Sequence, residues 1–408
     1  MDREHARVLL ATQTFPPAIG GTSVILYELV RHFPREMLVV VYGLGDPPEK
    51  EWQHLHFPRY RVLVNNSIRN TFLSMDYWPG LYVRLLRREI MRLARQYKVE
   101  RIYAHYPSAH FMIAAWQAAV KLRLPLTVYF DILWEECTQA RLGRLYEHKI
   151  VQYADMRIAI TEHAVDFLSK KHGVPFTLIP HTLDITKLPG ETPPTPVNEK
   201  PIVHFAGAIY PRMNQDSVVR LIAALESMQP QPVLDLCSAL QPPQEQELGL
   251  PKSFIQPRFL SRDALIQAQR QADILYLPLA FESDAPLMIE HNMPTKAMEY
   301  LVSGRPILVH APKESYLADL ARREGFALVV DQPDVQALAS ALQRLLQDRP
   351  LQEELVANAR AFARTRDSQL WAQRFMQMLA PDAAMEASPG TDVPVLGALG
   401  QPSSGRSF

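Results

Sequence analysis

The sequence predicts two doubly wound α/β domains, one in each half of the chain. Short apolar runs with strand character alternate with helical stretches throughout, a pattern typical of parallel sheets that helices cover on both faces. Between Lys187 and Lys200 the alternation gives way to a segment rich in proline and polar residues, which is typical of a linker. A chain of 408 residues is long enough for two domains. We therefore expect domains at residues 1–190 and 191–381.

Each half supplies its expected elements in order. The strands of the first half are Val8–Ala11, Leu38–Tyr42, Arg101–Ala104, Leu126–Phe130, Ile158–Ile160 and Thr177–Pro180. Its helices are Thr22–His32, Arg84–Tyr97 and His110–Lys121. The strands of the second half are Ile202–Ala206, Val233–Leu236, Ile274–Pro278, Pro306–Val309 and Ala327–Val330. Its helices are Asp216–Met228, Ser261–Gln271, Thr295–Val302, Ser315–Glu324, Val335–Asp348 and a long helical region, Leu351–Met378. Residues 382–408 are low in charge and rich in Gly, Pro and Ser, which predicts a disordered tail.

Composition argues against several classes of protein. The formal net charge is zero, so the overall charge does not point to nucleic acid as a partner. The sequence has no apolar run of about 18 residues, as a transmembrane helix would need, and its N-terminus lacks a signal-peptide pattern. The two cysteines, Cys137 and Cys237, are too few for a disulfide framework, so we expect a cytoplasmic protein.

The most informative segment is Asn292–Pro306 (NMPTKAMEYLVSGRP). Pro294 and Thr295 open an expected helix, Lys296 follows, and Glu299 lies one turn later. The first N–H groups of a helix attract anions, a lysine adds a point charge, and a carboxylate accepts two hydrogen bonds from a vicinal diol such as ribose. Together these groups predict a site for a nucleoside diphosphate. The alternative is an ordinary amphipathic helix with a surface lysine and glutamate.

A glycine-containing loop follows the first strand of each domain. Gly20 and Gly21 precede the first helix of the chain, where glycines let a backbone approach a ligand closely. The loop differs from the GxGxxG fingerprint, which argues against a Rossmann dehydrogenase. In the second domain, Gly207 ends the first strand and Arg212 follows, where an arginine can neutralise charge on a departing diphosphate. A plain turn and a solvated arginine are the alternatives.

Two polar residues of the first half follow strands directly. His105 and Asp131 should therefore point into a cleft at the carboxyl ends of the sheet, where we expect them to bind acceptor or donor sugar. A loop-capping aspartate and a structural histidine are the alternatives. Neither Glu135–Glu136 nor Asp284 forms a DxD motif, and no His/Cys cluster has ligand spacing. We therefore expect no catalytic metal and no cofactor.

The chain resembles the GT-B glycosyltransferases, specifically the retaining family 4 enzymes, from residue 8 to about residue 378. The segments that carry the resemblance are Phe15–Gly21 (FPPAIGG), Ile179–Asp184 (IPHTLD), Phe205–Gly207 (FAG), Phe259–Pro278 and Pro294–Pro306 (PTKAMEYLVSGRP). The resemblance implies two Rossmann-like domains facing across a cleft, with acceptor on the first and nucleotide sugar on the second. It places Glu299 at the ribose, Thr295 and Lys296 at the diphosphate, and Gly20–Gly21 near the donor phosphates and acceptor.

Three positions depart from the family pattern. His291 stands eight residues before Glu299, where the family commonly has a glutamate that contacts the donor sugar, and Glu290 is one residue out of register. Asp131 stands where relatives often have a histidine. The usual arginine–lysine pair of the second domain is incomplete, with Arg212 its strongest candidate. We assign His291, Pro294 and Gly207 to donor binding with the residues named above.

The resulting hypothesis is a cytoplasmic, metal-independent, retaining glycosyltransferase. It would move a sugar from a UDP- or GDP-linked donor to a glycan, lipid-linked or small-molecule acceptor. A non-catalytic nucleotide-sugar-binding scaffold and a nucleotide-sugar epimerase are the alternatives, since fold similarity does not decide chemistry. The basic helix Arg84–Arg95 and the aromatic segment Phe72–Tyr82 before it either contact an anionic membrane or form a solvated face.

Overall fold

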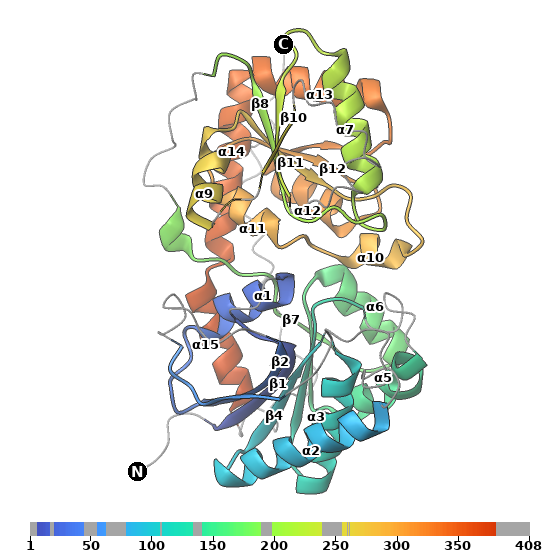
Figure 1. The fold of residues 1–408 in the computed structure, drawn as a ribbon, viewed down its shortest axis with the longest axis vertical. Coiled ribbons are helices and arrows are strands. Elements are labelled where there is room, and N and C mark those ends of the chain that lie inside the picture. Colours follow the sequence, from blue (N-terminus) through green and yellow to red (C-terminus); the bar gives the residue numbers. More distant parts are fainter. Residues whose placement is uncertain are drawn as a thin grey trace, which may run out of the picture.

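The computed structural model describes residues 6–16, 20–44, 55–62, 79–106, 108–133, 141–188, 198–238, 255–258, 260 and 262–380. These residues form two α/β domains, one above the other in Figure 1, each built on a parallel sheet. The predicted fold class is therefore confirmed. No helix in the described ranges has the length and apolar character needed to cross a bilayer. Cys137, the segment 72–78 and the tail 382–408 lie outside the described residues.

The first domain has a seven-stranded sheet in the order β3-β2-β1-β4-β5-β6-β7. Its strands are β1 (Val8–Thr14), β2 (Leu38–Leu44), β3 (Arg59–Arg61), β4 (Arg101–His105), β5 (Leu126–Phe130), β6 (Met156–Ala159) and β7 (Thr177–Leu178). Its helices are α1 (Gly21–Val30), α2 (Pro79–Gln96), α3 (Ala109–Leu122), α5 (Arg141–Tyr153) and α6 (Glu162–His172). Successive residues of β1 enter different cores: Leu9 packs with α2 and α3, whereas Leu10 packs with α1. Both faces of this sheet are therefore buried.

The second domain has a six-stranded sheet in the order β10-β9-β8-β11-β12-β13. Its strands are β8 (Ile202–Ala206), β9 (Val233–Cys237), β10 (Ile255–Arg258), β11 (Ile274–Pro278), β12 (Ile307–His310) and β13 (Ala327–Val330). Its helices are α7 (Gln215–Ser227), α9 (Arg262–Gln271), α10 (Pro286–His291), α11 (Lys296–Leu301), α12 (Tyr316–Glu324), α13 (Val335–Gln347) and α14 (Arg349–Thr365). Along β11, Leu275 and Tyr276 enter opposite cores.

The chain passes between the domains twice, and the two passages are hydrogen-bonded to each other. The Leu183 N–H donates to the Arg366 carbonyl at 2.9 Å, and the Ser368 N–H donates to the Leu183 carbonyl at 2.8 Å. Helix α15 (Ser368–Leu379) then packs against the first domain. There the centroid of the Phe375 ring lies 5.3 Å from the centroid of the Tyr103 ring.

Some elements differ from the sequence-based expectation. The expected helical region Leu351–Met378 is two helices, α14 and α15, because the chain crosses between domains at Arg366 and Asp367. The expectation omitted helices α5, α6 and α10 and strands β3 and β10. The helix expected at Thr295–Val302 spans Lys296–Leu301, one residue shorter at each end.

Candidate functional site

A cavity of about 1000 Å³ lies between the two domains. The first domain contributes the start of α1 and the end of β5, and the second contributes the loop after β8 and the segment joining α10 to α11. These are carboxyl ends of parallel strands, where doubly wound folds bind ligands. The predicted site residues that line it are Gly20, Gly21, Asp131, Gly207, Arg212, Pro294, Thr295, Lys296 and Glu299. The other two, His105 and His291, do not line it.

Lys296 supplies a cation to the wall of the cavity. It is the first residue of α11, and its Nζ lies 4.2 Å from the centroid of the Phe205 ring. Burial lowers the pKa of Lys296 from its usual value of 10.5 to about 7, and the charge of Glu299 opposes this shift. A lysine with a pKa near 7 is only partly protonated at neutral pH, and an anion bound beside it would raise the pKa and favour the charged form.

Glycines allow close approach on both sides of the cavity. Gly207 has φ +124°, and a Cβ atom there would lie 2.4 Å from Lys296 Nζ. Across the cleft, a Cβ on Gly21 would lie 3.2 Å from the Thr295 Cγ2 atom. The domains thus meet where the first turn of α1 faces the start of α11.

Glu299 lies one turn after the lysine, on the same cavity. The Gln269 side chain donates a long hydrogen bond of 3.5 Å to one of its carboxylate oxygens. The next residue, Tyr300, is buried and accepts a hydrogen bond of 3.0 Å from the Ala206 N–H. This bond fixes α11 against the end of β8, so Glu299 and Gly207 keep a defined separation.

Asp131 is an acidic residue that the first domain contributes to the cavity wall. Its carboxylate accepts a hydrogen bond from the Thr22 hydroxyl at the start of α1, and one of its oxygens lies 3.6 Å from His105 Nε2. His105 is fully buried, and its other ring nitrogen is 2.6 Å from the Tyr103 hydroxyl. The expectation that His105 points into the cleft is therefore wrong. It lies behind Asp131, because the first-domain core encloses it.

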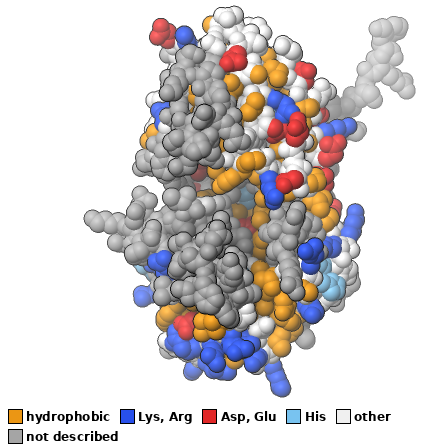
Figure 2. All heavy atoms as spheres, turned by 45° about the vertical axis from the view of Figure 1, so that its right-hand side comes forward, with side chains coloured by type: hydrophobic (Ala, Val, Ile, Leu, Met, Phe, Trp, Pro, Cys, Tyr) orange, Lys and Arg blue, Asp and Glu red, His pale blue; other side chains and the backbone are white. Residues whose placement is uncertain are grey.

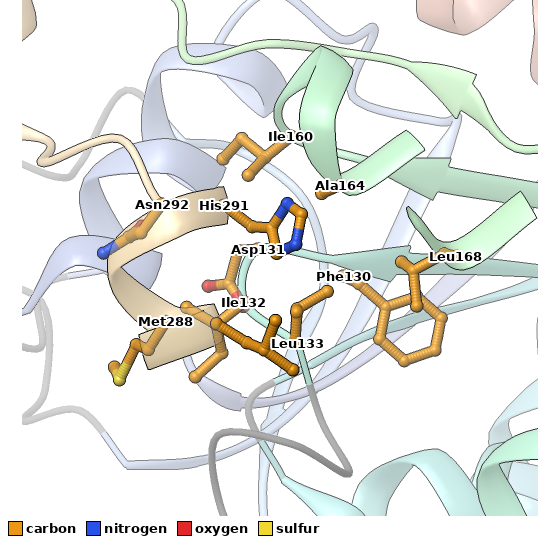
Figure 3. Close-up of a pocket in the computed structure, with 11 residues that line it drawn as sticks. Phe130, Asp131, Ile132, Leu133, Ile160, Ala164, Leu168, Met288, His291 and Asn292 are labelled. Carbon is orange, nitrogen blue, oxygen red and sulfur yellow. The ribbon is translucent and has the colours of Figure 1, made fainter. Parts of the chain in front are cut away.

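His291 lies at a second, much smaller cavity beside the cleft (Figure 3). This cavity of about 10 Å³ is also lined by Asp131, and it is about large enough for one water molecule. Asp131 Oδ1 and His291 Nδ1 are both buried without a hydrogen-bond partner. The His291 ring packs 4.9 Å from the Phe167 ring of the first domain. Burial, with a smaller contribution from His163, lowers its pKa to about 4, so His291 is neutral at pH 7.

Two family models match the chain and together span both domains. Residues 19–187 match the model for Glycosyltransferase Family 4, and residues 192–362 match that for glycosyl transferases group 1. The chain is a GT-B glycosyltransferase of family 4. Among curated proteins, none matches it.

Solved structures share the fold of this glycosyltransferase at low sequence identity. HepE from Anabaena in complex with UDP-glucose is 17% identical, with a TM-score of 0.71 over 92% of this chain and 99% of HepE. Sucrose-phosphate synthase from Thermosynechococcus elongatus is also 17% identical, with a TM-score of 0.69 over 92% of this chain and 98% of its own. A protein described as a UDP-N-acetylglucosamine 2-epimerase from Listeria monocytogenes is 13% identical, with a TM-score of 0.58 over 92% of this chain and 96% of its own.

The glycosyltransferase carries a further cation at the edge of the cavity. The Arg212 side chain is 50% exposed and forms an ion pair of 2.8 Å with Asp284. Arg212 also lines the cavity. An exposed ion pair of this kind contributes little to stability, so Arg212 is free to exchange Asp284 for an anionic ligand.

Among the residues of the cleft wall that sequence reasoning missed are two polar ones from the first domain, Thr22 and His181. His181 is 5% exposed, and neither of its ring nitrogens has a partner. Burial, with a smaller contribution from Arg366, lowers its pKa to about 3, so the ring is neutral. The segment Ile179–Asp184 contributed to the prediction only as part of the family resemblance. A histidine next to the domain crossing at Leu183 was the available signal.

Another buried polar cluster lies away from the cleft wall. Within the described part of the chain, His204, Asp235 and Cys237 are the three side chains close enough together to hold a metal ion. Both Asp235 oxygens are instead bound by the Arg258 guanidinium, at 2.7 and 2.6 Å, and His204 adds a third contact at 2.8 Å. The arginine takes the position that a cation would need, so we interpret this cluster as a structural ion pair.

Proposed function

We propose that this glycosyltransferase transfers a sugar, with retention, from a UDP- or GDP-linked donor to a glycan, lipid-linked or small-molecule acceptor. The observation that carries the proposal is the placement of Lys296 and Glu299. They lie one turn apart on the same large cavity, opposite Gly20 and Gly21 of the other domain. A cation and a diol acceptor at this spacing suit a nucleoside diphosphate.

The donor would lie along α11, with its ribose hydroxyls on Glu299 and its diphosphate between Lys296 and the loop that contains Gly207. Pro294 and Thr295 border the same space. The solved complexes of HepE with UDP-glucose, and with UDP and glucose, support a UDP-linked donor. Lys296 and Arg212 would stabilise the charge that develops on the departing diphosphate, in place of a metal ion.

Transfer with retention on one face of the sugar needs no protein nucleophile. The acceptor hydroxyl attacks the anomeric carbon as the bond to the diphosphate breaks, and the leaving phosphate oxygen takes the acceptor proton. The protein positions the reactants and stabilises charge. Asp131, which already accepts a hydrogen bond from the Thr22 hydroxyl, would accept a second one from a sugar or acceptor hydroxyl. We infer a cytoplasmic enzyme from the composition.

Thermal unfolding with a panel of nucleotides and nucleotide sugars tests the proposal. A ligand at a hundred times its Kd adds about 2.7 kcal/mol to the free energy of unfolding, and one diphosphate nucleotide should raise Tm selectively. Glu299→Ala should weaken that binding by roughly 1.5–3 kcal/mol, the value of a hydrogen bond to a charged group. Glu314→Ala, at an exposed position of the same domain, is the matched control.

Three outcomes would favour other functions. Nucleotide binding without transfer or donor hydrolysis would favour a scaffold. Formation of an epimeric nucleotide sugar would favour an epimerase. Equal nucleotide affinity of Glu299→Ala and the parent protein would contradict the ribose assignment.

A further inference from the structure

Helices α2, α3 and α5 pack side by side on one face of the first-domain sheet, and their outer surface has an unusual composition. Of the nine large hydrophobic side chains that are exposed in the described residues, five lie on these helices. They are Leu81 (50% exposed), Leu85 (46%), Val120 (45%), Leu145 (51%) and Tyr153 (38%). Isolated exposed hydrophobics are ordinary, but their concentration on adjacent helices indicates an interaction surface.

The same surface is strongly basic. Its exposed basic residues are Arg84, Arg88, Arg92, Arg95, Lys121, Arg123, Arg144 and Lys149. Among the described side chains of these helices the acidic ones are Glu89, which pairs with Arg92, and Glu147, which is buried. We call this surface, with the five hydrophobic residues above, the basic face. In Figure 2, lysine and arginine side chains gather beside hydrophobic ones at the lower end of the molecule.

Helix α2 shows how the basic face is built. Leu81, Leu85, Arg88, Arg92 and Arg95 are exposed at alternating spacings of four and three residues, which places them on one side of the helix. The opposite side, with residues such as Leu86 and Ile90, is buried in the core. The exposed leucines come from the first half of the helix and most of the arginines from the second. Folding therefore leaves an outward surface that is both cationic and apolar.

We propose that the basic face binds a membrane surface that contains anionic lipids, with the exposed leucines and Tyr153 entering the interfacial layer. Interfacial helices combine basic residues with apolar ones in this way, because charge attracts the lipid headgroups and apolar area anchors the contact. Positive charge would also attract nucleic acid, but exposed leucines would add nothing to the affinity for its phosphates. The proposal does not depend on the nucleotide assignment, since none of these residues lines the large cavity.

Co-sedimentation with vesicles tests the proposal. The full chain should bind vesicles of phosphatidylcholine mixed with phosphatidylglycerol, and bind pure phosphatidylcholine vesicles much more weakly. Binding should weaken as salt is raised, since exposed charges are screened over about 10 Å at 0.1 M salt. The variant Arg84→Glu/Arg88→Glu/Arg95→Glu should lose about a hundredfold or more in affinity, because each basic residue near an anionic surface contributes about fivefold.

Two further variants separate the components. Lys313→Glu/Arg349→Glu/Arg364→Glu makes the same charge change at exposed positions of the second domain. Its vesicle affinity should stay within about threefold of the parent protein's, because it loses only long-range attraction, which salt screens. Leu81→Ser/Leu85→Ser should weaken binding to anionic vesicles while keeping its salt dependence. The substituted residues of both variants are exposed, so the Tm of each variant should equal that of the parent protein.

Equal vesicle affinity of the parent protein and the α2 charge variant would overturn the proposal. So would equal losses in the α2 and second-domain variants, which would show that net charge alone decides. Binding to single-stranded RNA with no binding to anionic vesicles would assign the basic face to nucleic acid instead.

Discussion

The ammonium group of Lys296 occupies the space in which a side chain at Gly207 would begin, since a Cβ atom there would lie 2.4 Å from Nζ. Gly207→Ala should therefore push Lys296 out of its place over the Phe205 ring and weaken nucleotide binding. Gly173→Ala is the matched control: its φ is also positive, at +68°, but the space around it is open. Both variants should lose about 1 kcal/mol or more of stability from backbone strain. Equal nucleotide affinity in both variants would contradict the prediction.

Lys296 should also couple donor binding to protonation. Its pKa of about 7 in the free protein means that at pH 8 most molecules carry a neutral amine, and a bound diphosphate would favour the ammonium form. Binding should therefore take up a proton, and affinity should fall as pH rises through 7. Calorimetry of a nucleotide sugar at pH 8, in two buffers of different ionisation enthalpy, should give different heats. Lys296→Met should remove the difference. Identical heats for the parent protein would contradict the prediction.

The same pKa has a consequence for the free protein. The pKa of Lys296 is below its unfolded value of 10.5, so between about pH 7 and 10.5 the unfolded chain binds more protons than the folded one. This group therefore makes the free energy of unfolding rise with pH across that window. Denaturant unfolding at pH 7 and pH 9 measures this effect. The change in the free energy of unfolding from pH 7 to pH 9 should be more positive for the parent protein than for Lys296→Met.

The sequence predicted the cleft wall better than it predicted what lies behind it. The alternating pattern located most strands, and Lys296 and Glu299 follow from the composition of a single helix start. His105 was misplaced because it is buried against Tyr103 and Tyr129. Tyr103 in turn packs against Phe375 of helix α15, which returns from the far end of the chain. Tertiary contacts of this kind leave no local pattern. The division between α14 and α15 was missed for the same reason.

Asp131 should matter for turnover more than for nucleotide affinity. Asp131→Asn keeps the shape of the side chain but removes its charge and one hydrogen-bond acceptor, so we expect kcat to fall by about tenfold to a hundredfold or more. Tyr103→Phe removes the hydroxyl that holds His105 and should have a smaller effect in the same direction. Single-turnover rates and nucleotide Kd, measured side by side, check this. A loss confined to Kd would place Asp131 at the nucleotide instead.

Glu162 should help to hold the two domains together. It is the first residue of α6 in the first domain, and its carboxylate accepts a hydrogen bond from Tyr316 and lies 3.6 Å from Arg323 and 3.9 Å from Arg366. Glu162→Gln keeps a hydrogen-bond acceptor but removes the charge that these arginines meet, so the domains should separate more easily. We expect a larger radius of gyration by small-angle scattering and faster nucleotide dissociation. Glu226→Gln, at an exposed position of α7, should change neither. Another contact between the domains is the 2.8 Å hydrogen bond from the Thr161 hydroxyl to the His291 carbonyl. An unchanged radius of gyration and an unchanged rate of nucleotide dissociation in Glu162→Gln would contradict the prediction and show that such remaining contacts hold the domains together without the Glu162 charge.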